Sequence, residues 1–143
     1  MPLDLSQLGV SQDQVAVVLV DHGSQREESN RLLLDVAEAY RKHADWAIVE
    51  PAHMELAEPS IATAFARGVE QGAELVIVFP YFLGPGRHWN SDIPRLAAEA
   101  AAACGGVRYL VTAPLGLHAL LLKVIDERID ERIAERADDE TAC

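Results

Sequence analysis

Two histidines with the same local surroundings are the residues of this sequence best suited to chemistry. His22 follows an apolar run and precedes a glycine and a serine, and His88 follows a second apolar run and the loop 84–86, Gly-Pro-Gly. Each pattern indicates a strand, then a loop, then a helix. In open α/β sheets, ligands bind beyond the carboxyl ends of the strands, in loops of this kind. We therefore expect both imidazoles to lie at a binding crevice.

A carboxylate, Glu55, follows the second expected strand in the same way. If the strand order is 2-1-3-4, three adjacent strand ends carry His22, Glu55 and His88. Two imidazoles and a carboxylate suit a divalent first-row metal such as Fe, Co, Ni or Zn. The alternative is that each histidine only hydrogen-bonds a loop carbonyl.

The elements that must position these residues alternate regularly along the chain. Strands are expected over 14–20, 46–54, 73–82 and 107–113, and helices over 27–40, 61–71, 93–104 and 117–137. This alternation predicts an α/β fold with a four-stranded parallel sheet, of order 2-1-3-4, and helices on both faces. Pro51 lacks a backbone donor, so the second strand is expected at a sheet edge. The third strand is the most apolar and is expected at the centre.

Length and charge restrict the classes of protein to which the chain could belong. Its 143 residues fit a single domain, with 1–13 as an N-terminal lead and 138–143 as an acidic tail that we expect to fray. The formal net charge of −11 argues against binding to nucleic acid or to an anionic membrane surface. No apolar run approaches a membrane span, and the first residues have no secretory or transit pattern, so the expected location is the cytoplasm. The two cysteines, Cys104 and Cys143, have no CxxC spacing and cannot complete a four-cysteine cluster.

Weaker candidates surround the two histidines. Ser24 lacks the G-x-S-x-G surroundings of a hydrolase nucleophile, so we expect it to cap the following helix. The Gly-Pro-Gly loop lacks the pattern of a phosphate-binding loop. His53 lies two residues before Glu55, and strand alternation puts both side chains on one side of the sheet. A supporting or substrate-binding role is therefore open for His53.

Basic and aromatic residues near the histidines allow two interpretations each. Arg26, Arg31 and Arg87 could hold an anionic ligand or could be ordinary solvated charges, and Arg87 has the advantage of adjoining His88. Trp89 could stack on a flat ligand or could fill the core.

With these residues in view, the sequence resembles the small class II tetrapyrrole chelatases of the CbiX/SirB group. The matching stretches are VVLVDHGSQREESN, IVEPAHMELAEPSI, VIVFPYFLGPGRHWNSDIP and YLVTAPLGLH. They extend from the first strand to the start of the last helix. The segments DHGS, VEPAHMELAEPS and GRHW are most similar to those of the sirohydrochlorin ferrochelatases of the plant and cyanobacterial type.

The resemblance implies an enzyme that inserts Fe²⁺ into sirohydrochlorin in siroheme synthesis. Co²⁺ insertion for cobalamin is the alternative, Ni²⁺ is a further candidate metal, and no organic cofactor is implied. His22 and His88 match the metal-binding histidines of the family, and Glu55 matches its active-site carboxylate. We expect the macrocycle site to include Ser24, Arg26, His53, Gly86, Arg87 and Trp89. The resemblance also implies a homodimer, and the aliphatic stripe of the last helix agrees with one: Leu122, Ile125, Ile129 and Ile133.

The chemistry of metal insertion agrees with this set of residues. Metallation removes two pyrrole N–H protons and delivers a partly desolvated cation, so it needs a loose metal site and a proton acceptor. Neutral imidazoles supply the loose metal site, and Glu55 or His53 could supply the proton acceptor. A non-catalytic carrier of metal or tetrapyrrole would keep the two histidines but would need no base. The sequence lacks the motifs of a hydrolase that acts on a phosphate ligand.

Overall fold

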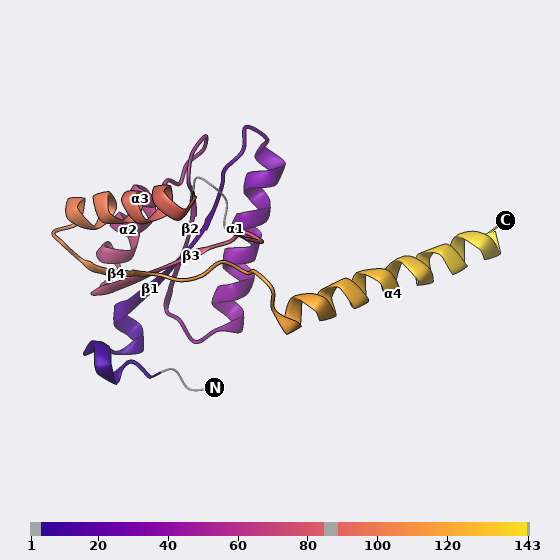
Figure 1. Cartoon of the computed structure of the whole chain (residues 1–143), viewed down its shortest axis with the longest axis horizontal. Coiled ribbons are helices and arrows are strands. Elements are labelled where there is room, and N and C mark those ends of the chain that lie inside the picture. Colours follow the sequence, from indigo (N-terminus) through magenta and orange to yellow (C-terminus); the bar gives the residue numbers. More distant parts are fainter. Residues whose placement is uncertain (1–3, 85–88, 143) are drawn as a thin grey trace.

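A single parallel sheet forms the centre of the molecule (Figure 1). The computed structural model describes residues 4–84 and 89–142, and side chains within 4–84 and 91–137. The strands are β1 (Val15–Asp21), β2 (Ile48–His53), β3 (Leu75–Pro80) and β4 (Arg108–Val111). Their order is β2-β1-β3-β4 and every neighbouring pair is parallel, as predicted. Pro51 lies on the edge strand β2, and β3 lies inside the sheet, so both expectations from composition are confirmed.

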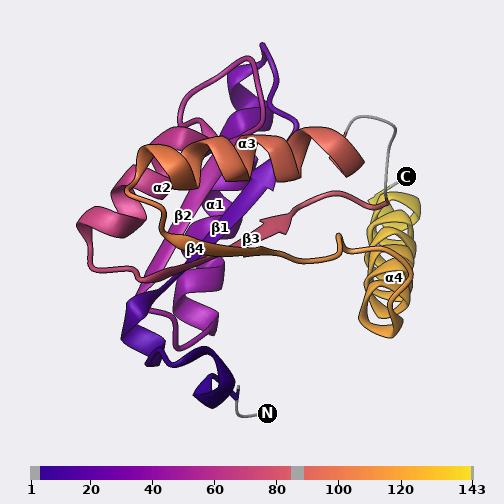
Figure 2. The same ribbon diagram turned by 60° about the vertical axis from the view of Figure 1, so that its left-hand side comes forward.

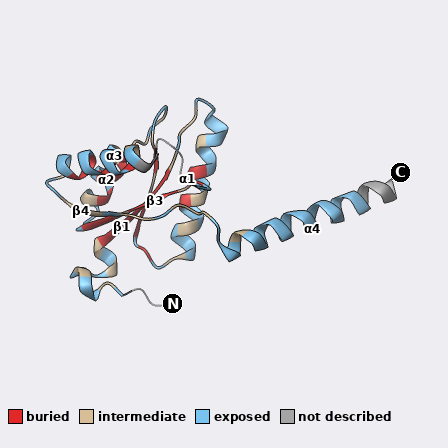
Figure 3. Cartoon of the chain, viewed as in Figure 1, coloured by how far each residue is buried: buried red, intermediate tan, exposed pale blue. Residues whose placement is uncertain are grey.

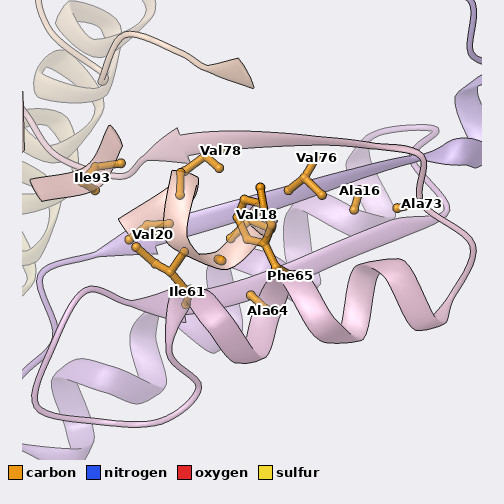
Figure 4. Packing of buried hydrophobic residues seen from close by; sticks show 14 of the residues in the cluster. Ala16, Val18, Val20, Ile61, Ala64, Phe65, Ala73, Val76, Val78 and Ile93 are labelled. Carbon is orange, nitrogen blue, oxygen red and sulfur yellow. The ribbon is translucent and has the colours of Figure 1, made fainter. Parts of the chain in front are cut away.

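Side-chain alternation along β1 divides the core into two halves. Ala16, Val18 and Val20 point to one face of the sheet, where α2 (Ile61–Glu70) and α3 (Trp89–Ala103) pack (Figures 2 and 4). Phe65 of α2 is fully buried at the centre of that half. Val15, Val17 and Leu19 point to the other face, where α1 (Glu27–His43) packs through Leu33 and Ala37. This two-residue period is the one expected of a strand buried on both sides.

The fourth helix does not join either layer. α4 (Ala119–Ala142) extends away from the sheet and from the other helices (Figures 1 and 2). Helices therefore cover both faces as predicted, but α1 is alone on its face of the sheet.

Several element bounds differ from those expected. Two short 3₁₀ helices, Ser6–Leu8 and Gln12–Gln14, form within the expected N-terminal lead. α3 begins at Trp89, before the helix-start signal read at 91–94, and so includes Pro94 near its start. α4 continues to Ala142 and so includes most of the expected acidic tail, whose fraying stays a prediction. The residues of that stretch include no glycine or proline to stop a helix.

No helix in the described part of the chain is long and apolar enough to cross a membrane. The expected location in the cytoplasm stays a prediction.

Candidate active site

Backbone hydrogen bonds join the loop that follows β1 to the loop that follows β2. The Met54 N–H donates to the Asp21 carbonyl at 2.9 Å, and the Glu55 N–H donates to the His22 carbonyl at 3.2 Å. Gly23 has φ +86°, and a Cβ added there would lie 1.9 Å from the Glu55 carbonyl oxygen. Only glycine fits such an approach. The predicted neighbours His22 and Glu55 are therefore held side by side by the backbone itself.

The pair formed by the buried His53 and the partly buried Asp21 fixes the turn that carries His22. His53 Nδ1 lies 2.6 Å from Asp21 Oδ1, and the same oxygen accepts from the Gly23 N–H at 3.0 Å. His53 is only 1% exposed, and its Nε2 is buried without a hydrogen-bond partner among the described residues. His53 is thus enclosed in the protein, which favours the supporting role over the substrate-binding role that the sequence left open.

The ring of His22 lies against an aromatic residue from the next strand end. Its centroid is 4.1 Å from that of Phe82, with an angle of 28° between the ring planes. Phe82 itself is buried and packs into the core on the α2 and α3 side. Within residues 4–84 and 91–137, neither ring nitrogen of His22 has a hydrogen bond. His22 is exposed, and the choice between a ligand and a hydrogen bond to a loop carbonyl outside the described residues stays a prediction.

The turn between His22 and α1 is held by an asparagine that the sequence did not single out. Asn30 Oδ1 accepts from the Ser24 N–H at 3.0 Å, and Asn30 Nδ2 donates to the Ser24 carbonyl at 2.8 Å. Ser24 Oγ accepts from the Arg26 N–H at 2.9 Å, and Arg26 is the N-cap residue of α1. The expectation that Ser24 caps the helix is therefore wrong, because its hydroxyl closes the turn before the helix begins.

The loop between β2 and α2 places Glu55 in solvent and ties the other carboxylate of the loop, Glu58, to the helix. Glu55 is exposed. Glu58 accepts from the Thr63 hydroxyl at 2.8 Å and from the Ser60 N–H at 3.1 Å. The bond from Thr63, and then that from Ser60, hold the pKa of the Glu58 carboxyl below its ordinary value. Ser60 accepts from the Thr63 N–H at 3.1 Å and so caps α2 as predicted.

Two exposed leucines flank the His22 and Glu55 loops. Leu56 is 61% exposed and has φ +70°, a conformation that a large side chain rarely adopts. Leu83, directly after Phe82, is 76% exposed. Backbone strain at a loop tip and apolar side chains in water are both features that ligand-binding loops carry. Sequence reasoning missed these leucines because a leucine beside an apolar run indicates core.

The second half of the predicted site lies outside the described residues. This applies to His88, Gly86 and Arg87, and to the side chain of Trp89. Among the described side chains, no three of His, Cys, Asp and Glu come together as a metal site. The predicted cluster needs His88, so it stays a prediction. Arg26 is exposed, and no ion pair with it occurs among the described side chains.

Comparison with known proteins gives one consistent result. The CbiX family model matches residues 16–132. The sirohydrochlorin ferrochelatase of Arabidopsis thaliana, named as chloroplastic, is 50% identical over 131 residues, which are 92% of this chain and 58% of that protein. The sirohydrochlorin cobaltochelatase of Sulfurisphaera tokodaii is 30% identical, over 80% of this chain and 91% of that one. The present chain thus spans less than two thirds of the Arabidopsis protein.

Solved structures agree with the sequence matches. A CbiX protein from Marinobacter aquaeolei VT8 superimposes with a TM-score of 0.74 at 30% identity, covering 85% of this chain and 98% of that chain. The sirohydrochlorin chelatase SirB from Bacillus subtilis subspecies spizizenii, in complex with cobalt, superimposes with a TM-score of 0.76 at 29% identity. It covers 82% of this chain, which spans 50% of SirB.

Proposed function

Because the chain belongs to the CbiX family, we propose that it is a sirohydrochlorin ferrochelatase, which inserts Fe²⁺ into sirohydrochlorin to give siroheme. The observation that carries this proposal is the pairing of His22 and Glu55. An exposed imidazole, whose nitrogens have no hydrogen bond among the described side chains, follows β1, and an exposed carboxylate follows β2, on two loops that meet at Gly23. Metallation requires a ligand that holds the metal and, at the same position, a group that accepts protons.

The two groups act on different partners in the reaction. Fe²⁺ enters as a substrate and is held by His22, with His88 as the second proposed ligand. As the metal bonds the four macrocycle nitrogens, the two pyrrole N–H bonds break and two protons leave. Glu55 accepts these protons and passes them to the solvent that surrounds it. The charge balances, because one dication replaces two protons.

His53 supports this site through Asp21 and does not touch the substrate. Its ring is buried, so it cannot easily exchange protons with a bound macrocycle. It holds Asp21, and Asp21 holds the Gly23 amide of the turn that carries His22. We therefore assign Glu55 as the proton acceptor and His53 as a positioning residue.

The macrocycle is recognised by apolar and by positively charged groups. Leu56 and Leu83 offer apolar surface to its flat face. Its carboxylates need local cations, because the protein as a whole carries a net charge of −11. Arg26 and Arg87 supply these cations in our proposal, and Ser24, Gly86 and Trp89 complete the contacts.

Cobalt insertion is the second candidate activity. The Sulfurisphaera relative is named a cobaltochelatase, and the SirB structure was solved in complex with cobalt. The affinity of a histidine and carboxylate site follows the Irving–Williams order and does not identify the metal used in the cell. We propose Fe²⁺ because the relative with 50% identity is named a ferrochelatase. We further propose that the active form is a homodimer.

A metallation assay tests this function directly. Purified protein is mixed with sirohydrochlorin and Fe²⁺, Co²⁺ or Ni²⁺ in parallel anaerobic reactions, and the change in macrocycle absorbance is followed. The proposal predicts rates above the protein-free control, with Fe²⁺ turned over. Binding of sirohydrochlorin without acceleration for any metal would identify a carrier. Acceleration with Co²⁺ alone would identify a cobaltochelatase.

A further inference from the structure

One leucine beside the candidate site carries backbone strain that another residue would avoid. Leu56 has φ +70°, and within the described part of the chain it is the only residue other than glycine with a positive φ. In this left-handed region the Cβ of a bulky side chain crowds its own backbone, so glycine and asparagine are the residues that adopt it readily. A leucine at this position therefore lowers the stability of the fold.

The side chain of Leu56 makes no contribution to the core that would offset this strain. It is 61% exposed and belongs to neither half of the core. The loop is held before this residue, where the Glu55 N–H donates to the His22 carbonyl at 3.2 Å. It is held again after it, where Glu58 accepts from the Thr63 hydroxyl at 2.8 Å. Strain that persists at an exposed residue between two such anchors indicates a functional contact.

A second exposed leucine follows the strand on the other side of His22. Leu83 is 76% exposed, and its carbonyl accepts from the Gly116 N–H at 2.6 Å, which fixes its backbone. Because β1 lies between β2 and β3, Leu56 and Leu83 follow the strands on either side of the one that leads to His22. The strands β1 and β3 are mostly buried, whereas exposed residues occur in the loops beyond the strand ends (Figure 3). Exposed apolar side chains next to polar ones mark a ligand-binding surface.

The neighbours of the two leucines identify what they contact. Leu56 adjoins Glu55, and Leu83 adjoins Phe82, whose ring lies against that of His22. The leucines therefore continue the candidate active site, and a ligand that covers the site meets both of them. Adjacent strands lie ~5 Å apart, so the strands that lead to Leu56 and Leu83 are ~10 Å apart, which suits a broad, flat molecule.

We propose that Leu56 is a specificity-determining residue that contacts the flat apolar face of the tetrapyrrole ring, with Leu83 as the second contact. This inference deepens the proposed function and rests on it, because it takes the macrocycle as the ligand. A leucine cannot pair with the carboxylates of the macrocycle, so it selects for the conjugated ring itself. The strain at Leu56 is retained because burial of the side chain against the ring offsets it in the bound state.

Replacement by asparagine separates binding from stability. Asparagine tolerates a positive φ, so we expect Leu56→Asn to unfold at a higher urea concentration than the unchanged protein. Its affinity for sirohydrochlorin without metal, measured by fluorescence quenching, should fall by ~10-fold or more, because an apolar contact is lost. Leu83 has no positive φ, so Leu83→Asn should lose affinity without gaining stability.

Leu34→Asn is the matched control. Leu34 is 42% exposed and lies within α1, where asparagine forms a helix less readily than leucine. The control should therefore unfold at a lower urea concentration and bind sirohydrochlorin as the unchanged protein does. The same substitution thus shifts stability in opposite directions at Leu34 and Leu56, and it affects binding at Leu56 alone of these two.

Three results would overturn the proposal. Unchanged affinity in Leu56→Asn would mean that the leucine does not contact the macrocycle. A lower urea midpoint in that variant would mean that the leucine is not strained. A loss of affinity that shrinks as salt is added would place the effect on charges, because apolar contacts are not screened. The unchanged protein is measured in parallel, and its failure to bind sirohydrochlorin would reject the proposed function as well.

Discussion

At the residue scale, the site depends on how tightly the turn around His22 is held. Asp21 pairs with His53 and accepts a hydrogen bond from the Gly23 N–H. Asn30 of α1 holds the other end of the turn through two hydrogen bonds to Ser24. Phe82 sets the position of the imidazole ring. If His22 is the metal ligand that we propose, a position held in this way needs little reorganisation when the cation arrives, which favours binding.

Gly23 provides the most severe test of this arrangement. In Gly23→Ala, the new methyl group meets the Glu55 carbonyl and the backbone keeps an unfavourable φ, so the His22 and Glu55 loops must separate. We expect metallation to be lost and the free energy of unfolding to fall by more than the ~1–3 kcal/mol that strain alone costs. Gly106→Ala is the matched control, because Gly106 has φ +80° but nothing within 4 Å of an added Cβ. Equal losses of stability in urea for the two variants would contradict the close approach of the loops.

The two histidines are predicted to share the metal. His22→Ala and His88→Ala should each weaken Co²⁺ binding measured by calorimetry, and the double variant should nearly abolish it. His43→Ala, at the end of α1, is the control and should bind as the unchanged protein does. Undiminished binding in the double variant would place the metal elsewhere.

His22 and Glu55 could be predicted from sequence because glycine-flanked polar residues after apolar runs point to strand ends. The residues that hold them could not. Asn30 and Phe82 reach the site from a helix and from a neighbouring strand end, and no local pattern distinguishes them from helix surface and core. The His53–Asp21 pair joins residues far apart in the chain through strand pairing. The alternation of side chains along a strand predicts on which side of the sheet His53 lies. The burial of its side chain depends on the path of the loop 54–60.

At the scale of elements, the strand order followed from simple physical signals. Proline marked the edge strand, and the most apolar run marked an inner one. The start of α3 was misplaced because Ser91, Asp92 and Pro94 form a strong start signal inside a helix that begins earlier. Local signals of that kind are weak evidence for a boundary when tertiary packing extends the helix.

The start of α2 gives a prediction about pH. The pKa of Glu58 is held below its ordinary value of 4.5, chiefly by the Thr63 hydroxyl. A carboxyl with a lowered folded-state pKa adds stability above its unfolded pKa and loses it as the pH falls through the folded value. Thr63→Val removes the largest cause, so the pKa of Glu58 should rise toward 4.5, as measured by carbon-detected NMR titration. Ala62→Val, at the next position of α2, is the control and should leave this pKa unchanged. An unshifted Glu58 in Thr63→Val would show that the bond is absent in solution.

At the scale of the whole molecule, the chain consists of a compact α/β body and a projecting α4 (Figure 1). The stripe on α4 could be read from sequence, because its spacing follows the period of a helix. Its direction could not, since that depends on the connection to β4, which the loop after β3 holds through two backbone hydrogen bonds. The same loop bonds the connection between β4 and α4 and supplies Phe82 to His22, so the direction of α4 and the candidate site share one structural support.

In the reaction that we propose, Glu55 accepts the protons that the macrocycle loses on metal insertion. Glu55→Gln keeps the size of the side chain but removes the proton acceptor, and Glu58→Gln is the matched control from the same loop. The decisive measurement is the metallation rate of each variant beside its affinity for sirohydrochlorin, followed by fluorescence quenching. We predict that Glu55→Gln slows metallation by ~10²–10⁴-fold while affinity stays within a few-fold, and that Glu58→Gln changes neither. Full metallation activity in Glu55→Gln would mean that Glu55 is not the proton acceptor.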